Sequence, residues 1–414
     1  MTNYSFILVC YDNCDLTKKA LESLLESFDL NCRGRGIEVI IINNNSKDET
    51  IEVVQRIKED YKGIIEIVLV NMVENMGYSI GVNVGLSKAT GKIITILNND
   101  LIFPRDWFNG LASALDKDSS LGVTVPYLSY ASGVQNVEVK LDSLQKIQEF
   151  AYKFTNEHKG SIVYTNRAIG ACLTMKREVI ELIGGCDFWF GLGMYDDDDW
   201  CLRIRVSGYK IAIIGDSFVY HIGNATIARN SEHVTAAILS NCKKFMKKWD
   251  MKGNEYKEGL YTDREKLLDA TIYERQKHFF PVKCEDYITV SQDQKTKIKI
   301  SKCLLIADWT NYKSEWERKL EQFLLNCNNS ELYLWIPQQY FDKEEVLDKI
   351  IKSVQDLENK DKLLSSILKI KYDNINPIEL ISFMKQFDNI LFVENDYVNK
   401  FIVNLANQIN IQTI

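Results

Sequence analysis

The sequence lacks a long hydrophobic run. No segment of its 414 residues approaches the roughly 18 consecutive apolar residues that a membrane-spanning helix needs. The first residues, MTNYSFILVCYDN, also lack the basic region and the small-residue cleavage site of a signal peptide. These absences predict a soluble, cytoplasmic protein without a membrane span.

Paired cysteines and a basic stripe are also missing. The ten cysteines include no CxxC pair, and most stand in apolar runs such as FILVCY and IGACLTM, which predicts reduced, buried thiols. Lys and Arg total 50 against 57 Asp and Glu, giving a net charge of -7, and both signs are spread along the chain. A nucleic-acid partner is therefore not expected.

What the sequence does contain is the pattern of an α/β protein. Its first hundred residues alternate short β-branched runs with amphipathic stretches, which is typical of a parallel sheet with helices between the strands. We expect strands at residues 6–10, 38–42, 65–70 and 92–97, and helices at about 16–28, 47–61 and 77–90.

Three glycines recur at intervals of four in the last of these helices. Gly77, Gly81 and Gly85 would lie on one helix face and let the helix backbone approach the sheet closely. A membrane dimer through GxxxG is the alternative, and the short segment with Asn83 and Lys88 inside it argues against that.

The rest of the sequence predicts further parts, one of which is a second α/β-like block at about residues 169–221. Residues 137–154 indicate a helix or an inserted lobe, and residues 230–295 read as a mostly helical, highly charged connector. From residue 296 strands and helices alternate again, which predicts a small C-terminal α/β domain of unknown role. This domain has ADWTNYKS, not a glycine-rich phosphate loop, after its first strand. The predicted first domain is residues 1–229 and the last 296–414.

Polar residues follow two of the predicted strands. Ligands of a parallel sheet bind outside the carboxyl ends of the strands. Residues 43–50, NNNSKDET, contain Ser46 and Asp48, which suit a helix cap, but the three asparagines exceed what a cap requires. Residues 98–100, NND, indicate either a turn or an oxygen site for Mg²⁺ or Mn²⁺ that bridges the phosphates of a nucleotide.

The acidic run MYDDDDWCLR, residues 194–203, is the third polar feature. Four neighbouring carboxylates repel one another, and a position in the first turn of a helix lowers that cost. Asp199 and Arg203 are four apart, so we expect them to pair as a structural anchor, with Asp198 solvated.

Taken in order, these segments resemble glycosyltransferase family 2. The resemblance covers about residues 4–225 and rests on ILVCYDN, NNNSKDET, ENMGYSIGVNVGLSKATGKIITILNND, IGACLTMKREVIELIGGCDFWFG, YDDDDWCLRIRVSGYKI and VYHIG. It implies a GT-A fold, which is a Rossmann-like, mainly parallel mixed sheet, and an inverting transferase that uses a nucleotide-diphosphate sugar.

The resemblance also implies roles for single residues. It places the nucleotide-sugar donor against Val9, Cys10, Tyr11, Asn43, Asn75, Gly77, Asn98 and Asn99. A divalent cation, Mn²⁺ or Mg²⁺, would lie on Asp100 and His221, although a histidine in VYHIG otherwise reads as a core residue. Asp197 would be the general base toward the acceptor hydroxyl, with Asp196 as the neighbouring candidate. The family often has Asp where Asn43 and Asn98 stand.

Two questions stay open in the sequence. Four aromatic residues near the acidic run form either an apolar platform for a sugar or part of the core: Trp189, Phe190, Tyr195 and Trp200. The predicted function is transfer of a single sugar, from a donor of the UDP-GlcNAc or dTDP-rhamnose type, to a hydroxyl of a saccharide or a protein such as flagellin. The alternative is an inactive sugar- or partner-binding module.

Overall fold

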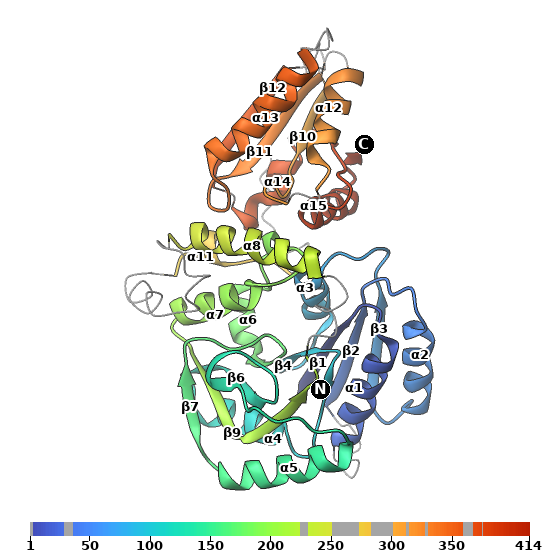
Figure 1. Ribbon diagram of the computed structural model, residues 1–414, viewed down its shortest axis with the longest axis vertical. Helices are drawn as coiled ribbons and strands as arrows, with labels where there is room; N and C mark the ends of the chain where they lie inside the picture. The colour runs from blue at the N-terminus through green and yellow to red at the C-terminus, as the bar shows by residue number, and fades with distance from the viewer. Residues whose placement is uncertain are drawn as a thin grey trace. The chain divides into compact units, whose positions relative to one another are not determined.

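The computed structural model describes residues 3–28, 36–223, 231–250, 273–282, 301–311, 314–327, 330–358, 367–374 and 376–414. These residues form two compact units, which are described separately below (Figure 1). The first consists mainly of Met1–Cys186 and Asp196–Ser231. The second contains Asp187–Tyr195 together with most of the chain after Glu232. The predicted boundaries at residues 229 and 296 remain predictions.

The first unit is built on a nine-stranded mixed sheet with the order β3-β2-β1-β4-β8-β6-β9-β5, and β7 pairs with β9. The parallel half consists of β1 (Tyr4–Cys10), β2 (Ile37–Asn43), β3 (Glu66–Asn71) and β4 (Ile93–Asn98). The other half consists of β5 (Leu101–Ile102), β6 (Leu121–Leu128), β7 (Ile162–Thr165), β8 (Cys172–Lys176) and β9 (Lys210–His221). Here β8 runs antiparallel to β4 and β6, which makes the sheet mixed.

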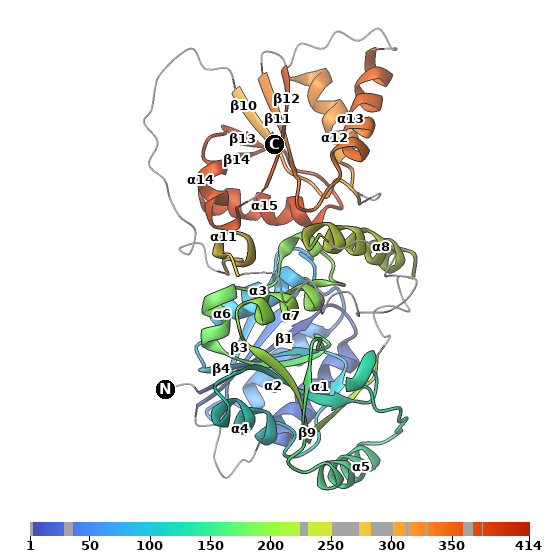
Figure 2. The same cartoon turned by 90° about the vertical axis from the view of Figure 1, so that its left-hand side faces the viewer.

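Helices cover both faces of the parallel half (Figures 1 and 2). Phe6 and Leu8 of β1 belong to a buried cluster with residues of α1 (Cys14–Ser27), α2 (Thr50–Asp60) and α4 (Asn109–Lys117). Ile7 and Val9 point to the opposite face, where α3 (Tyr78–Lys88) lies. Alternate residues of one strand thus pack against different helices, as a strand buried on both faces requires. The predicted α/β fold with a mainly parallel mixed sheet is confirmed.

The glycines of α3 bring this helix onto the sheet, as expected. A Cβ atom on Gly81 would lie 2.8 Å from Cγ1 of Val9, and one on Gly85 would overlap Cγ2 of Ile7. Gly77 has a different task, because it precedes the helix with φ 84° and ψ 170°. Gly81 and Gly85 therefore allow α3 to pack closely on β1, and Gly77 allows the positive φ of the turn before the helix.

Three more helices complete the first unit: α5 (Leu144–Glu157), α6 (Arg177–Ile183) and α7 (Asp196–Val206). The helix predicted over residues 137–154 begins only at Leu144, because Ser143 has an extended backbone and its Oγ caps the helix by accepting from the amide of Lys146. A short 3-10 turn lies at Gly133–Gln135, and a second one, Phe188–Phe190, belongs to the second unit.

The second unit contains a five-stranded parallel sheet, with the order β12-β11-β10-β13-β14. Its strands are β10 (Ser301–Leu305), β11 (Ser330–Pro337), β12 (Ile367–Asp373), β13 (Asn389–Ile390) and β14 (Gln412–Thr413). Figure 2 shows α12 (Trp316–Asn326) and α13 (Lys343–Glu358) on one face of this sheet, and α14 (Leu380–Met384) and α15 (Tyr397–Gln408) on the other. The predicted small C-terminal α/β domain is confirmed.

The helical connector predicted over residues 230–295 is described only in part. Its described helices are α8 (Ser231–Lys248) and α11 (Arg275–His278), while residues 251–272 and 283–300 lie outside the described ranges. Within the chain that the structure describes, no helix has both the length and the apolar composition needed to cross a bilayer.

The described cysteines are free thiols, as expected. Six of them are buried, namely Cys10, Cys172, Cys186, Cys201, Cys242 and Cys303, while Cys14 and Cys327 are half-buried. Burial raises the pKa of the Cys10 and Cys201 thiols to about 12. Cys32 and Cys284 lie outside the described residues.

Candidate active site

The tips of three parallel strands bring several predicted donor residues to one edge of the first sheet. Cys10 pairs with Asn43, and Val9 pairs with Asn98, so the carboxyl ends of β1, β2 and β4 lie side by side. Tyr11 follows β1 directly and is 38% exposed. This edge is where a parallel sheet binds its ligands.

The loops after β1 and β2 are held together by hydrogen bonds. The amide of Asp12 donates to Oγ of Ser46 (2.9 Å), the amide of Lys47 donates to Asp12 Oδ1 (2.7 Å), and the amide of Cys14 donates to Asp48 Oδ2 (2.8 Å). Asp48 is not the cap of α2, because the N-cap residue is Glu49; Asp48 Oδ1 instead accepts from the amide of Thr50 (3.1 Å) in the turn before the helix. Ser46 does not cap the helix and instead joins the two loops.

The asparagines after β2 hold the loops at this edge of the sheet through hydrogen bonds. Asn43 is buried, its Nδ2 donates to Asn71 Oδ1 (3.1 Å), and its Oδ1 accepts from the amide of Ser46 (3.0 Å). Asn44 in turn donates to the carbonyl of Gly77 (3.0 Å), whose amide donates to Asn75 Oδ1 (2.9 Å). The amide group of Asn43 is thus engaged within the protein, so its contacts support a role in holding the loop.

Asp100 and His221 meet at the end of β4. In the antiparallel pairing of β5 with β9, Leu101 lies opposite His221, and His221 Nε2 is 3.2 Å from Asp100 Oδ1. The other ring nitrogen, Nδ1, lies 2.7 Å from the carbonyl oxygen of Tyr130. A proton on Nδ1 can donate to that carbonyl, which turns Nε2 toward Asp100. Burial lowers the pKa of His221, but Asp100 and the Tyr130 carbonyl outweigh burial and leave it raised.

Two oxygens at this strand tip have the character of metal ligands. Asn98 Oδ1 and Asp100 Oδ1 are buried, and neither has a well-formed hydrogen bond within the described structure. Together with the imidazole of His221 they suit a hard divalent cation. The described residues contain no cluster of three or more His, Cys, Asp or Glu arranged for a metal ion. The remaining ligands would therefore be oxygens of a bound diphosphate and water.

The acidic run forms the first turn of α7, as expected. Asp197 Oδ2 accepts from the amide of Gly170 (3.0 Å), and its Oδ1 accepts from the amide of Asp198 (2.9 Å). The next residue, Ala171, accepts from the amide of Asn98 (2.9 Å). The segment Gly170–Ala171 therefore connects the end of β4 directly to the proposed base.

Asp196 and Asp197 are electrostatically coupled. Burial, followed by the charge of Asp197, raises the pKa of Asp196 to about 8. Burial and the charge of Asp198 also raise the pKa of Asp197, while Arg167 and the two amides oppose that rise. Near neutral pH Asp196 therefore holds a proton, and the two carboxylates titrate as a coupled pair.

The other two aspartates are neutralised by arginines. The expectation that Asp198 is solvated was wrong, because Asp198 is buried and its Oδ1 lies 2.6 Å from Nε of Arg167. The predicted anchor is confirmed: Asp199 and Arg203 are both 0% exposed and pair at 2.8 Å. Arg203 also donates to the carbonyls of Ile183 (2.9 Å) and Gly185 (2.8 Å).

Three of the four aromatic residues belong to the core and form no sugar platform. Trp189, Phe190 and Trp200 are buried, so their ring faces are not available to a ligand. Only Tyr195 is partly exposed, and its ring centroid lies 5.4 Å from that of Phe245.

Tyr78 was not identified from the sequence. Its hydroxyl donates to the carbonyl of Gly170 (3.3 Å). Burial raises its pKa well above the usual range, and Asp196, Cys186, Asp197 and Asp100 add to that rise. Tyr78 thus lies near the carboxylates of the acidic helix, Asp196 and Asp197, and near Asp100 at the tip of β4. The signal in the sequence is an aromatic residue directly after Gly77 at the start of the glycine-rich helix.

Comparison with known proteins identifies the family of the region that contains the strand tips of this site. Residues 5–183 match the family model described as glycosyl transferase family 2. The N-terminal part of the chain is a glycosyl transferase family 2 domain. The strand tips with Asn43 and Asp100 lie inside the matched residues, and the acidic helix follows the matched region.

The chain also aligns with curated proteins. The poly-beta-1,6-N-acetyl-D-glucosamine synthase of Staphylococcus aureus (strain MSSA476) is 27% identical over 217 residues, which are 50% of this chain and 47% of that protein. The chain therefore spans about half the length of the curated relatives it matches.

Solved structures also align with the chain. A mannosyltransferase, PcManGT from Pyrobaculum calidifontis in complex with GDP-Man and Mn²⁺, gives a TM-score of 0.42 at 19% identity, covering 59% of this chain and 62% of that one. GalNAc-T7 with UDP, GalNAc and Mn²⁺ gives a TM-score of 0.46 at 17% identity, covering 64% of this chain and 51% of that one.

Replacing Asp199 with Asn tests the anchor of the glycosyltransferase domain. The change leaves the buried guanidinium of Arg203 without its counter-charge, so the free energy of unfolding should fall by about 3–5 kcal/mol. Urea unfolding of the variant measures this loss. The control is Glu59→Gln, which breaks the exposed pair with Lys62 (3.0 Å) and should change the stability little. Equal effects of the two changes would contradict the anchor role.

Proposed function

We propose that the protein is an inverting glycosyltransferase that transfers a single sugar from a nucleotide-diphosphate donor to an acceptor hydroxyl. One observation carries the proposal. Gly170–Ala171 is hydrogen-bonded on one side to Asp197 and on the other to Asn98 at the tip of β4. A carboxylate that can act as a base therefore lies beside the strand tip where a diphosphate would bind.

The donor is proposed to be of the UDP-N-acetylglucosamine type, with dTDP-rhamnose as the second candidate. Support for the first comes from the relative that is named as a synthase of poly-beta-1,6-N-acetyl-D-glucosamine. The acceptor would be a hydroxyl of a cell-surface saccharide or of a protein such as flagellin.

Asp100 and His221 are the residues that would hold a divalent cation, Mn²⁺ or Mg²⁺. The proposal rests on the buried oxygens of Asn98 and Asp100, which have no well-formed hydrogen bond in the described structure, and on the imidazole nitrogen 3.2 Å from Asp100. A bound cation of this kind offsets the negative charge that develops on a leaving diphosphate.

The residues of the chain suit a single displacement. Asp197 would take the proton of the acceptor hydroxyl while the acceptor oxygen forms a bond to the anomeric carbon. The bond from that carbon to the diphosphate breaks on the opposite face, so the configuration inverts. Asp196, which holds a proton near neutral pH, could donate a hydrogen bond to the acceptor. Tyr78 would help to position Asp197 through Gly170.

The second candidate function is an inactive sugar- or partner-binding module. Asn43 and Asn98 stand where the family often has aspartate, and this observation favours it. Turnover decides between the two functions, because an inactive module can still bind a donor but does not transfer its sugar.

A panel of nucleotide sugars tests donor binding. UDP-, dTDP- and GDP-sugars are added with and without Mn²⁺, and the melting temperature of the protein is recorded. A ligand that binds only the folded state raises this temperature. We expect one nucleotide class to stabilise the protein, and to do so more strongly with Mn²⁺. The absence of any shift would contradict the proposed function.

The variant Asp197→Asn tests the base. It keeps the shape of the side chain but cannot accept the proton, so turnover should fall by roughly 10²-fold or more while the thermal shift by the donor persists. Turnover is measured as release of the nucleoside diphosphate from the donor selected by the panel, with N-acetylglucosamine oligosaccharides as trial acceptors. Asp116→Asn on the exposed side of α4 is the control and should leave the rate unchanged. Full activity of Asp197→Asn would eliminate this base.

The pH dependence of kcat/KM tests the raised pKa of Asp197. The base must be ionised, so activity is present above its pKa and is lost as the pH falls through it. Because the pKa is raised, this loss should occur above the value of about 3.9 that is usual for aspartate. Arg167→Gln should move the loss to higher pH, since the arginine lowers the pKa of Asp197. If the loss of activity in Arg167→Gln moved to lower pH instead, the assignment of Asp197 as the base would be contradicted.

A further inference from the structure

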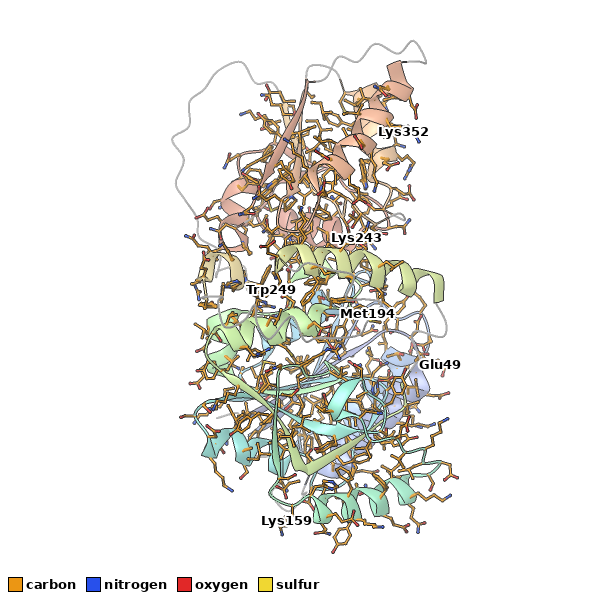
Figure 3. The ribbon with its side chains drawn as sticks, turned by 60° about the vertical axis from the view of Figure 1, so that its left-hand side comes forward. Glu49, Lys159, Met194, Lys243, Trp249 and Lys352 are labelled. Carbon is orange, nitrogen blue, oxygen red and sulfur yellow. The ribbon has the colours of Figure 1, made fainter. Side chains whose placement is uncertain are left out.

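The segment Asp187–Tyr195 belongs to the second compact unit, although the residues before and after it belong to the first. It leaves the glycosyltransferase domain after Cys186, and one peptide bond joins its last residue to Asp196, the first residue of α7. Figure 3 marks Met194 in this segment and Lys243 on α8. The contacts that hold the segment are therefore contacts within the second unit.

Asp187 is the first point at which the segment is held. It is completely buried, and its Oδ2 accepts from Nζ of Lys248 (2.8 Å) and from the hydroxyl of Tyr340 (2.7 Å). Tyr340 also stacks on Trp189 with ring centroids 5.1 Å apart. Tyr340 follows β11, so the C-terminal domain itself supplies both a hydrogen bond and a ring face.

Helix α8 holds the middle of the segment through two buried polar side chains. Lys244 Nζ donates to the carbonyl of Trp189 (2.6 Å) and to Asp308 Oδ2 (2.7 Å). Asn241 Nδ2 lies within hydrogen-bonding distance of the carbonyls of Phe190 (2.8 Å), Gly193 (2.6 Å) and Met194 (3.1 Å). The backbone of the segment is thus bound nearly along its whole length.

Asp308 lies where a sheet of this topology would bind a ligand. The chain runs from β10 to β12 on one side of the sheet and then crosses to β13 and β14 on the other, so the strand order reverses between β10 and β13. Ligands of open parallel sheets bind at the carboxyl ends of strands at such a reversal. Here Asp308, three residues after β10, is paired with Lys244, and its amide donates to Asp396 (2.8 Å) after β13. A side chain of the protein's own helix α8, Lys244, therefore contacts Asp308 at this position.

The turn before α7 has a strained backbone. Met194 and Tyr195 have φ angles of 72° and 67°, in the left-handed region that side chains disfavour. Such strain persists only where surrounding contacts impose it. Asn241 contacts the carbonyl of Met194, and Phe245 packs on Tyr195, so α8 supplies these contacts.

We propose that the C-terminal domain and α8 act as an intramolecular clamp on Asp187–Tyr195, and that this clamp positions the start of α7 with Asp196 and Asp197. The inference rests on the proposed function and deepens it, because it makes Lys248, Lys244 and Tyr340 positioning residues for the base. The donor is bound by the strand tips of the other unit. The clamp should therefore affect turnover and leave donor binding unchanged.

The test uses the full chain with Tyr340→Phe and Lys248→Met, which each remove one donor from Asp187. Tyr340→Phe retains the ring, so it should fold even if Lys248→Met does not. Hydrogen exchange of the peptide covering residues 187–195 should become faster in the variants. The kcat for release of nucleoside diphosphate should fall by roughly tenfold or more, since small displacements of a catalytic group are costly. The donor KM should stay at the wild-type value.

A matched control lies in the same unit. Lys369 pairs with Glu331 at 2.8 Å across β11 and β12, and Lys369→Met should change neither the exchange of residues 187–195 nor kcat. Unchanged exchange in Tyr340→Phe and Lys248→Met would overturn the clamp. Faster exchange with an unchanged kcat would overturn its role in positioning the base. If the wild type releases no nucleoside diphosphate, the proposed function fails, and the exchange data alone still decide whether the clamp holds the segment.

Discussion

The buried pair of Asp199 and Arg203 is the interaction on which the rest of the acidic region depends. Arg203 binds a carboxylate within its own helix and two carbonyls at the end of α6, so it joins α6, Gly185 and α7. Next to this junction, Asn83 of α3 exchanges two hydrogen bonds with the backbone of Cys186 (2.8 and 2.7 Å). The chain can therefore leave the glycosyltransferase domain after Cys186 and return at Asp196 with both ends fixed.

The same pair helps to explain how four adjacent aspartates coexist. Arg203 neutralises Asp199 and Arg167 neutralises Asp198, which leaves only Asp196 and Asp197 without an arginine in the ion pairs of the described structure. A buried carboxylate that lacks a counter-charge retains its proton more strongly. The cluster thus separates into two structural ion pairs and one coupled pair of carboxylates, and the pKa of each carboxylate in the coupled pair is raised.

Local interactions were predictable from the sequence, and distant ones were not. β2 and α1 lie close to their predicted segments because β-branched runs and helical periodicity are local signals. The pair Asp199–Arg203 follows from helical spacing in the same way. Arg167 and Asp198 are 31 residues apart in the sequence, and Asp187 and Tyr340 are 153 residues apart. No local sequence pattern predicts either contact. From the sequence alone, without the contact between Asp187 and Tyr340, Trp189 and Phe190 could equally be assigned to a sugar-binding platform or to the core.

The buried thiols give the glycosyltransferase domain an internal reporter. Because burial keeps Cys10 and Cys201 protonated far above neutral pH, almost none of either thiol is present as the reactive thiolate in the folded state. Alkylation at these positions then requires local opening of the surrounding backbone. Cys10 lies at the end of β1, and Cys201 lies in α7. The alkylation rate of Cys10 would therefore report local unfolding at the strand tips, and that of Cys201 would separately report local unfolding of the acidic helix.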